Sequence, residues 1–280
     1  MGNTCLQPNI KQNKISQIQL LACGSCENDL GIVFRGRKKE KRTFPAMVGV
    51  IHHRKYGVIL YDTGYSERIK KCGIKSFLYQ LVNKATVCRE EIISNQLLKQ
   101  GIKDEDVKYI ILSHAHPDHI GALRHFHHYS LLSTKDVFCS MKNGKLRDLV
   151  FGGMLPVHPV KKYVVREKKH RDSFLYHYFD HVYDICRDGS ILGVPLDGHA
   201  KGQLGLYFPE YNLLLAADAC WGKDLMECVP RMNPIPRLIQ NDFKAYENTV
   251  RTLQHLQADH PEVEIVFSHQ TGGFPQYADV

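Results

Sequence analysis

The stretch Ser113-His114-Ala115-His116-Pro117-Asp118-His119 places three imidazoles and one carboxylate within six consecutive positions, directly after the apolar run 107–112. The apolar run predicts a buried strand, and a proline near a first turn predicts that a helix begins at Pro117. Imidazole and carboxylate side chains together suit zinc, iron or manganese. Because these four side chains can diverge from one tight loop, we expect them to bind two neighbouring ions rather than one.

A second group of histidines, at His125, His127 and His128, receives the opposite interpretation. The chain contains 16 histidines, so some clusters arise by chance. We expect these three to lie on the helix that follows Pro117, in surface or core packing. A solvated histidine-rich loop is also the alternative for the first cluster, but the strand before it and the helix after it favour a metal site.

The pattern of elements predicts an α/β fold, a four-layer αββα sandwich, with an antiparallel opening. Helical periodicity marks residues 90–100 and 242–257. Strand-rich halves that are each followed by helices indicate two sheets packed face to face with helices outside. The expected strands are 15–23, 31–35, 44–52, 57–64, 107–112, 191–195, 205–209, 212–217 and 264–268.

Length and composition are consistent with a single domain over residues 1–280, since a 43% hydrophobic fraction supports a sizeable core. No dominant period is seen around 123–190, where we expect an insertion of short helices and loops that faces the substrate. Active-site loops would gather at one edge of the two sheets.

The net charge of +8 is concentrated in two runs, residues 35–42 and 161–171, which we interpret as solvated loops or hairpin tips. Nucleic-acid binding is not expected, because neither aromatic interleaving nor a recognisable nucleic-acid-binding module accompanies the charge. No apolar run approaches 18 residues, so we expect no membrane span.

Nine cysteines, an odd number without scaffold spacing, indicate reduced thiols and a cytoplasmic protein. The N-terminus also lacks the basic and apolar regions of a secretory signal. The pair Cys23 and Cys26 forms a CxxC motif, for which a redox pair and half of a zinc site are alternatives. We expect a loop between the first two strands with two free or occasionally bridged thiols.

Four further polar residues stand where predicted strands end. His199, Asp218 and His269 each follow an apolar run into a polar turn, although a lone histidine or aspartate at a strand end is more often structural. Asp62 follows the strand-like run 57–61. It can face the same site as the histidines, or its carboxylate can cap its own loop as an Asx turn.

Together these residues resemble the signature of the metallo-β-lactamase fold superfamily, HxHxDH followed by a distant His, an Asp and a His. The matching positions, in the family's order, are His114, His116, Asp118, His119, His199, Asp218 and His269. The resemblance extends from about residue 15 to the C-terminus and includes the early Asp-containing strand end at Asp62.

The resemblance implies a site for two divalent metal ions, with zinc expected and iron or manganese as alternatives. One ion would bind His114, His116 and His199, and the other Asp118, His119 and His269, with Asp218 bridging. Asp118 would also take part in catalysis, by orienting a bridging hydroxide or returning a proton to the leaving group. Asp62 would steer a ligand imidazole.

Comparison with branches of the superfamily narrows the implied function. The commonest β-lactamases have Cys in place of Asp218, and flavodiiron proteins have Glu in place of His116. The overall length, the early strands and the segment before His199 are most similar to the N-acyl homoserine lactonases. This implies a quorum-quenching hydrolase in which a bridging hydroxide attacks the carbonyl of a small-molecule lactone.

Two other functions remain open. The same centre could hydrolyse another ester, a thioester or a phosphoester, or the chain could bind a ligand with little turnover. The lactonases carry a Tyr shortly after the bridging Asp, and this chain has Trp221 there. An indole donates through its N–H but cannot transfer a proton as a phenol does. Whether Trp221 lines the pocket or packs in the core is left open, as is the oligomeric state.

Overall fold

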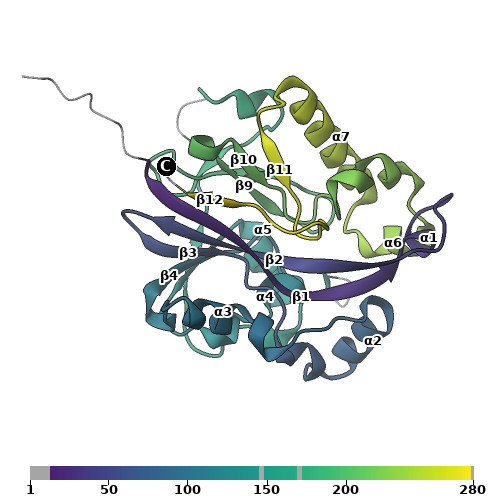
Figure 1. Ribbon diagram of the computed structural model, residues 1–280, viewed down its shortest axis with the longest axis horizontal. Helices are drawn as coiled ribbons and strands as arrows, with labels where there is room; N and C mark the ends of the chain where they lie inside the picture. Colours follow the sequence, from purple (N-terminus) through teal and green to yellow (C-terminus); the bar gives the residue numbers. More distant parts are fainter. Residues whose placement is uncertain (1–12, 145–147, 169–171, 279–280) are drawn as a thin grey trace, which may run out of the picture.

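The computed structural model describes residues 13–144, 148–168 and 172–278. Two sheets lie face to face, and helices cover their outer sides, as the prediction of a four-layer α/β sandwich requires (Figure 1). The expectation about the N-terminus falls mostly on residues outside the described part. In the part that is described, no helix is both long enough and apolar enough to cross a bilayer.

The first sheet has seven strands and confirms the antiparallel opening. The β1, β2 and β3 strands pair antiparallel, whereas β3 to β6 are parallel. The order in the sheet is β12 (Gln276–Ala278), β1 (Ile15–Asp29), β2 (Lys41–His53), β3 (Gly57–Tyr61), β4 (Val107–Ile111), β5 (Ser130–Ser133) and β6 (Lys161–Val164).

The second sheet has five strands from the C-terminal half. Its pairs are antiparallel except for β10 and β11, which run parallel. The order is β11 (Glu264–Val266), β10 (Leu213–Leu215), β9 (Leu204–Phe208), β8 (Leu192–Pro195) and β7 (Tyr183–Asp184).

The two faces of each sheet pack into different hydrophobic cores, which shows why the sequence builds four layers. In β3, Ile59 and Tyr61 belong to the core between the sheets, whereas Leu60 belongs to the core beneath the helices. In β10, Leu213 and Leu215 face the other sheet and Leu214 faces outward. Since side chains alternate along a strand, an unbroken apolar strand must be covered on both faces.

The helices lie mainly on the outer sides of the sandwich. Figure 1 shows α2 and α3 outside the first sheet and α7 outside the second. The α-helices are α1 (Leu30–Val33), α2 (Gly73–Asn83), α3 (Ile93–Lys99), α4 (Pro117–Ile120), α5 (Lys135–Asn143), α6 (Pro234–Ile239) and α7 (Phe243–Asp259). The 3-10 helices are η1 (Glu67–Lys70), η2 (Arg89–Glu91), η3 (Asp104–Asp106), η4 (Leu123–His125), η6 (Gly152–Met154), η7 (Phe174–His177), η8 (Pro209–Tyr211) and η9 (Lys223–Arg231).

The prediction of a strand over 31–35 is wrong, because this segment begins with α1. The Asp29 carboxylate accepts a hydrogen bond from the backbone N–H of Gly31 and caps the helix. Only Phe34 makes a β-bridge, with Met232. The first basic run consequently follows a helix, and it leads into β2, whose pairing with β1 begins at Lys41.

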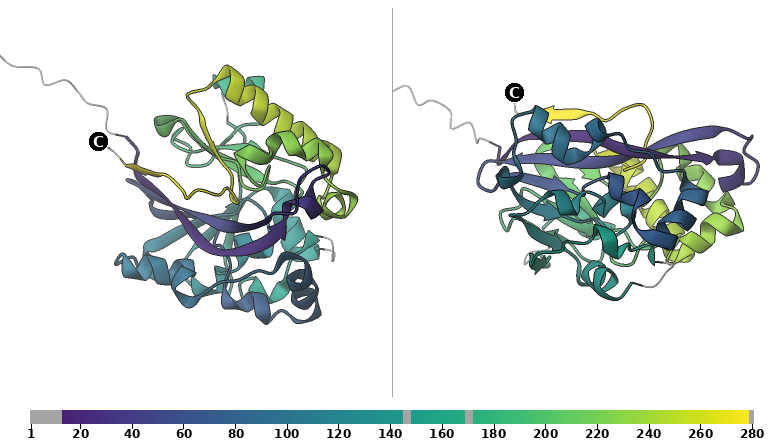
Figure 2. Two further views of the ribbon diagram at one scale, coloured as in Figure 1. Left: turned by 45° about the vertical axis from the view of Figure 1, so that its right-hand side comes forward. Right: turned by 90° about the horizontal axis from the view of Figure 1, so that it is seen from below.

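The expected loop at Cys23 and Cys26 is also wrong, since β1 continues through both residues to Asp29. A register shift between Ala22 and Ser25 lets the strand bend while it stays paired with the long β2. Both thiols are buried and free. The other cysteines in the described ranges are also free, and some of them are buried whereas others are exposed. In Figure 2, β1 and β2 are the longest strands and reach well beyond their neighbours.

We predicted an insertion of short helices and loops over residues 123–190, but this segment also supplies strands to both sheets. It contains β5 and β6, which extend the first sheet, and β7 at the edge of the second, and the remainder consists of short helices and loops. In the second basic run, β6 is an exposed edge strand rather than a hairpin tip, and residues 169–171 of that run lie outside the described part. The strands β5 and β6 join the sheet by parallel pairing, which requires long connections between the strands. The periodicity within each short segment does not reveal this pairing.

The second histidine group does not lie on a helix that continues from Pro117, because α4 ends at Ile120. His125 ends η4, where its Nδ1 lies 2.9 Å from the Ser94 hydroxyl, and His127 pairs with Asp104 at 2.7 Å. These contacts are packing and surface contacts.

Candidate metal centre

The strand ends bring the predicted site residues to one edge of the sandwich. Because β3 and β4 are parallel, their carboxyl ends place Asp62 and the 113–119 loop side by side. In the second sheet the parallel strands β10 and β11 end just before Asp218 and His269. The β8–β9 connection supplies His199.

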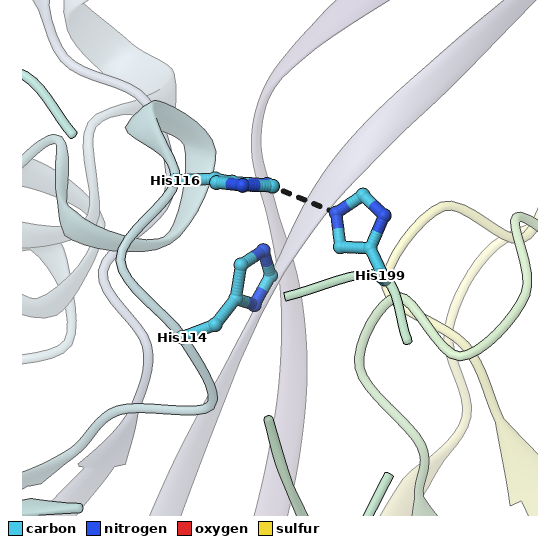
Figure 3. Close-up of side chains that lie close together, drawn as sticks. All are labelled: His114, His116 and His199. Atoms are coloured by element: carbon cyan, nitrogen blue, oxygen red, sulfur yellow. Dashed lines mark hydrogen bonds between the residues drawn. The ribbon is translucent and has the colours of Figure 1, made fainter. Parts of the chain in front are cut away.

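Seven buried side chains form two adjacent groups of possible metal ligands. In each group, one nitrogen or oxygen atom from every residue lies within 4.8 Å of the others. One group is His114, His116 and His199, and the other is Asp118, His119, Asp218 and His269. Figure 3 shows the three imidazoles of the first group converging from the 113–119 loop and from the opposite sheet.

The atoms that face inward are close enough to share cations. His116 Nδ1 lies 2.9 Å from His199 Nε2 (Figure 3). In the second group, His269 Nε2 lies 3.0 Å from Asp218 Oδ2 and 3.3 Å from Asp118 Oδ2.

Asp218 lies between the two groups. Its Oδ2 is 3.3 Å from His199 Nε2, and its Oδ1 is 3.2 Å from His119 Nε2. The residue before it, Ala217, has a left-handed backbone with a φ of 45°, which is uncommon for a residue other than glycine. A carboxylate in this position can bridge two ions.

The outward nitrogens of four imidazoles are held by oxygen atoms. His199 Nδ1 lies 2.8 Å from Gln240 Oε1, and His269 Nδ1 lies 2.7 Å from the Pro45 carbonyl oxygen. His114 Nδ1 lies 2.9 Å from the Ser113 hydroxyl. Since carbonyl oxygens only accept, His199 and His269 donate from Nδ1 and keep Nε2 as the inward-facing nitrogen.

The fourth imidazole is that of His119, and the Asp62 carboxylate holds its outward nitrogen instead of capping its own turn. Its Oδ2 accepts from His119 Nδ1 at 2.8 Å, and its carboxylate also accepts from the backbone N–H and hydroxyl of Ser113. Asp62 adopts a φ of 63°, a conformation that costs a non-glycine residue energy. The turn is anchored by Thr63, whose N–H and hydroxyl both donate to the His119 carbonyl.

The two groups differ in their protonation. Burial lowers the pKa of His114, His116 and His199, and that of His116 falls to about 3. Although burial opposes it, the positive charges of His269 and His119 hold the pKa of Asp218 well below its usual range. The first group therefore offers neutral imidazoles, and the second group offers an ionised carboxylate.

The donor set fits divalent metal ions. Three buried atoms that face the centre, His114 Nε2, His119 Nε2 and Asp218 Oδ1, make no hydrogen bond, although the last two lie 3.2 Å apart as an ion pair. Leaving such atoms unsatisfied is costly, and cations would satisfy all three. Imidazole and carboxylate ligands suit zinc, and also iron and manganese.

A cavity of about 410 Å³ opens onto the centre and answers the question about Trp221. Trp221 lines this cavity together with Asp118 and Asp218. Its ring also packs edge-on against Phe34 and Phe44, so the indole belongs both to the pocket wall and to the adjoining core.

Several residues of the site were not singled out from the sequence. Gln240 and the Pro45 carbonyl come from segments far from the histidine motif, and no local signal marks them. Ser113 precedes the motif directly, so a hydroxyl next to a ligand histidine was the available signal. Tyr79 lines the cavity as well, and so does Cys26, which the sequence marked only as part of the CxxC motif.

Comparisons with known proteins agree with this geometry. Residues 43–130 match the family model described as the metallo-beta-lactamase superfamily. No curated protein sequence gives a significant match.

Among solved structures, an N-acyl homoserine lactone hydrolase with the product N-hexanoyl-L-homoserine bound is 18% identical, with a TM-score of 0.70 over 92% of this chain and 94% of that chain. AidC, described as a dizinc quorum-quenching lactonase, is 16% identical, with a TM-score of 0.62 over 97% and 96%. A probable metal-dependent hydrolase from Staphylococcus aureus is 12% identical, with a TM-score of 0.65 over 93% and 91%. These likenesses extend over nearly the whole fold.

Proposed function

We propose that this chain, which has the metallo-β-lactamase fold, is a hydrolase that uses two divalent metal ions, with zinc expected, to open a lactone. N-acyl homoserine lactones are the proposed substrates, which would make the protein a quorum-quenching enzyme. The observation that carries the proposal is the set of seven buried ligand side chains, three of whose inward atoms make no hydrogen bond. The lactonase structures named above, which share the fold, support the choice of substrate.

When bound, two such ions would lower the pKa of a shared water molecule and polarise a carbonyl group. His114, His116 and His199 would hold one ion, and Asp118, His119 and His269 the other, with Asp218 between them. Asp118 lines the cavity, with its Oδ2 3.3 Å from His269 Nε2. From there its carboxylate can accept a proton and pass it to the leaving oxygen.

The cavity suits a small ester with an apolar chain. Its volume of about 410 Å³ lies in the range of small-molecule sites. Ile32, Val33, Leu149 and Ile235 line it, and these side chains can exclude water from an acyl chain. Three positions after the bridging carboxylate, Trp221 can donate one hydrogen bond through its indole N–H.

A substrate panel tests the proposal. Protein loaded with zinc, its metal content checked by elemental analysis, should open short-chain and long-chain N-acyl homoserine lactones, as followed by proton release. A metal-loaded protein that opens none of them would contradict the lactonase assignment.

A second candidate function is hydrolysis of another ester, a thioester or a phosphoester, and Trp221 favours it because an indole cannot replace a phenol in proton transfer. Aryl esters, thioesters and phosphoesters therefore belong in the same panel. Turnover of one of these classes with none of any lactone would select this candidate.

A cytoplasmic location remains a prediction from the unpaired cysteines.

A further inference from the structure

The α2 helix exposes most of its apolar side chains, whereas a surface helix usually buries its apolar face. The α2 helix buries Ser76 and Tyr79. Its apolar side chains are instead 47% to 70% exposed, namely Ile74, Phe77, Leu78, Leu81 and Val82. Their spacing of three and four residues places them on one stripe of the helix. An exposed apolar patch of this kind marks an interaction surface.

The stripe leads to the entrance of the metal-centre cavity. Leu81 and Val82 line that cavity, and so do Ile32 of α1 and Ile235 of α6, which are also strongly exposed. Figure 1 shows α1, α2 and α6 at the same end of the sandwich. We call these exposed side chains the apolar rim, which comprises Ile32, Ile74, Phe77, Leu78, Leu81, Val82 and Ile235.

Basic residues flank the apolar rim. Lys70 and Lys71 precede α2, and the exposed residues Arg35, Lys38 and Lys39 follow α1. Neither Lys70 nor Lys71 forms an ion pair with any residue in the described ranges. The first basic run of the sequence thus lies next to the rim rather than at an isolated hairpin tip.

Of the acidic residues near the rim, Asp29 caps α1, whereas Glu27 and Glu67 lie beside basic side chains. Glu27 lies 3.7 Å from Lys41 and 3.8 Å from Lys84, and Glu67 lies 3.4 Å from His125. The α2 helix contains no acidic residue. The surface around the rim therefore combines apolar side chains with an excess of positive charge.

We propose that this face docks on the surface of an anionic phospholipid bilayer, with the cavity entrance turned toward the lipid. Apolar side chains flanked by lysines and arginines are the pattern that binds the interface of anionic membranes. A second copy of the chain would bring one basic flank against another, which disfavours self-association through this face. An amphiphilic substrate could then reach the cavity directly from the bilayer.

Vesicle flotation with the metal-loaded full chain tests this surface. The protein should float with vesicles of phosphatidylcholine and phosphatidylserine, bind vesicles of phosphatidylcholine alone much more weakly, and dissociate partly at high salt. The double variant Ile74→Glu/Phe77→Glu should weaken binding at least about tenfold. Leu98→Glu is the matched control, since Leu98 lies on α3, away from the cavity, and is 62% exposed against 59% for Phe77.

A pair of charge-reversal variants separates the electrostatic contribution to vesicle binding from the apolar one. Lys70→Glu/Lys71→Glu should weaken binding to the anionic vesicles at least about tenfold, whereas Lys99→Glu on α3 should leave it unchanged. Equal binding by these variants and the wild-type protein would overturn the proposal.

Two other outcomes would also overturn it. One is wild-type protein that does not float with anionic vesicles. The other is a dimer, seen by sedimentation velocity, that Ile74→Glu/Phe77→Glu dissociates while no vesicle binding is found. Flotation does not depend on turnover, so a failed substrate panel would leave this result standing. Ile74 and Phe77 do not line the cavity, so hydrolysis of a water-soluble substrate by the double variant should match the wild type.

Discussion

Two clusters of histidine and acidic side chains lie at opposite ends of the sandwich, and they differ in where their imidazole nitrogens point. The metal-centre edge follows the end of β3, whereas His53 pairs with Gly57 at the start of β3. His53, Cys186 and Asp188 each offer an atom within 4.8 Å of the others, as the metal-centre ligands do. Proximity alone does not distinguish the two clusters.

The hydrogen bonds of His53 distinguish them. Its Nδ1 accepts from the backbone N–H groups of Lys55 and Tyr56, at 3.1 and 3.3 Å. A neutral imidazole that accepts at Nδ1 carries its proton on Nε2, which lies 3.0 Å from the Ser190 hydroxyl. His53 Nε2 then has no lone pair for a metal ion. In the metal centre, His199 and His269 instead donate from Nδ1, so that Nε2 is the nitrogen that faces the ligand groups.

The same geometry excludes a catalytic triad at His53. Asp188 lies 3.5 Å from Nε2, on the same side of the ring as Ser190, rather than at Nδ1 where a triad carboxylate orients its histidine. Ser190 also donates to Asp188. The comparison teaches that the partner of the outward nitrogen, more than the residue types, decides what a buried histidine can do.

Replacing one histidine in each cluster should show the largest difference between the two clusters. His116→Ala should lose one metal ion and at least about a hundredfold in activity, because it removes an inward donor. His53→Ala should keep both ions and its activity, but lower the free energy of unfolding by about 1–3 kcal/mol, since Ser190 and Asp188 lose a partner. Elemental analysis, kinetics and urea unfolding measure the three quantities.

Cys23→Ser is a further control for that pair. Its thiol lies in β1 and offers nothing to the metal-centre groups, so metal content and activity should remain at the wild-type level. An active, fully metallated His116→Ala protein would contradict the site assignment.

The next largest effect should come from the carboxylate that holds an outward nitrogen. Asp62→Asn should lower metal affinity about 10-fold to 100-fold, because an amide orients the His119 imidazole less strongly than a carboxylate does. Competition with a zinc-binding dye measures the affinity. The matched variant Asp188→Asn, in the other cluster, should leave it unchanged, and an equal loss in both variants would refute the distinction.

Gln240→Leu should have a smaller effect of the same kind. The leucine cannot accept from His199 Nδ1, so the ring loses the partner that sets its tautomer, and metal affinity should fall about tenfold. Gln203→Leu is the control, because Gln203 is also buried but bonds to the Leu196 carbonyl. An affinity for zinc that is unchanged in Gln240→Leu would show that the tautomer needs no such support.

The smallest effect should be a pH dependence carried by His53. Burial lowers its pKa from the ordinary value of 6.5, with Asp188 opposing the shift. Because the folded pKa lies below the unfolded one, the stability that His53 contributes is complete above about pH 6.5 and is lost as the pH falls through the folded pKa.

Unfolding of metal-free protein tests this linkage. Between about pH 7.5 and about pH 5.5, His53→Gln should lose less stability than the wild type. An equal or larger loss in the variant would contradict the assignment.

Much of the fold and most of the site follow from local sequence patterns. The strand before His114, the helix that begins at Pro117 and the polar residues at the ends of later strands are each marked by residues next to them in the chain. Parallel strands then bring those ends to one edge, which is why a linear motif with three distant residues could predict the cluster.

Other elements escaped prediction because their determinants are distant contacts. The α1 segment looks like a strand from its apolar residues, but the Asp29 cap and the antiparallel return into β2 make it a helix. The strands β5 and β6 look irregular until β4 provides an edge for parallel pairing. The α2 helix was not predicted, although the apolar residues at 74, 77, 78, 81 and 82 have helical spacing.

Residue types and strand-end positions in the chain predict the seven candidate metal ligands and their order, because ligand chemistry resides in the side chains themselves. Which imidazole nitrogens face the centre depends on the folded protein, through Asp62, Gln240 and the Pro45 carbonyl. The folding of the chain also determines that the exposed apolar stripe of α2 leads to the cavity entrance, where Leu81 and Val82 line the cavity. These are matters of packing between segments far apart in the chain, which no local pattern records.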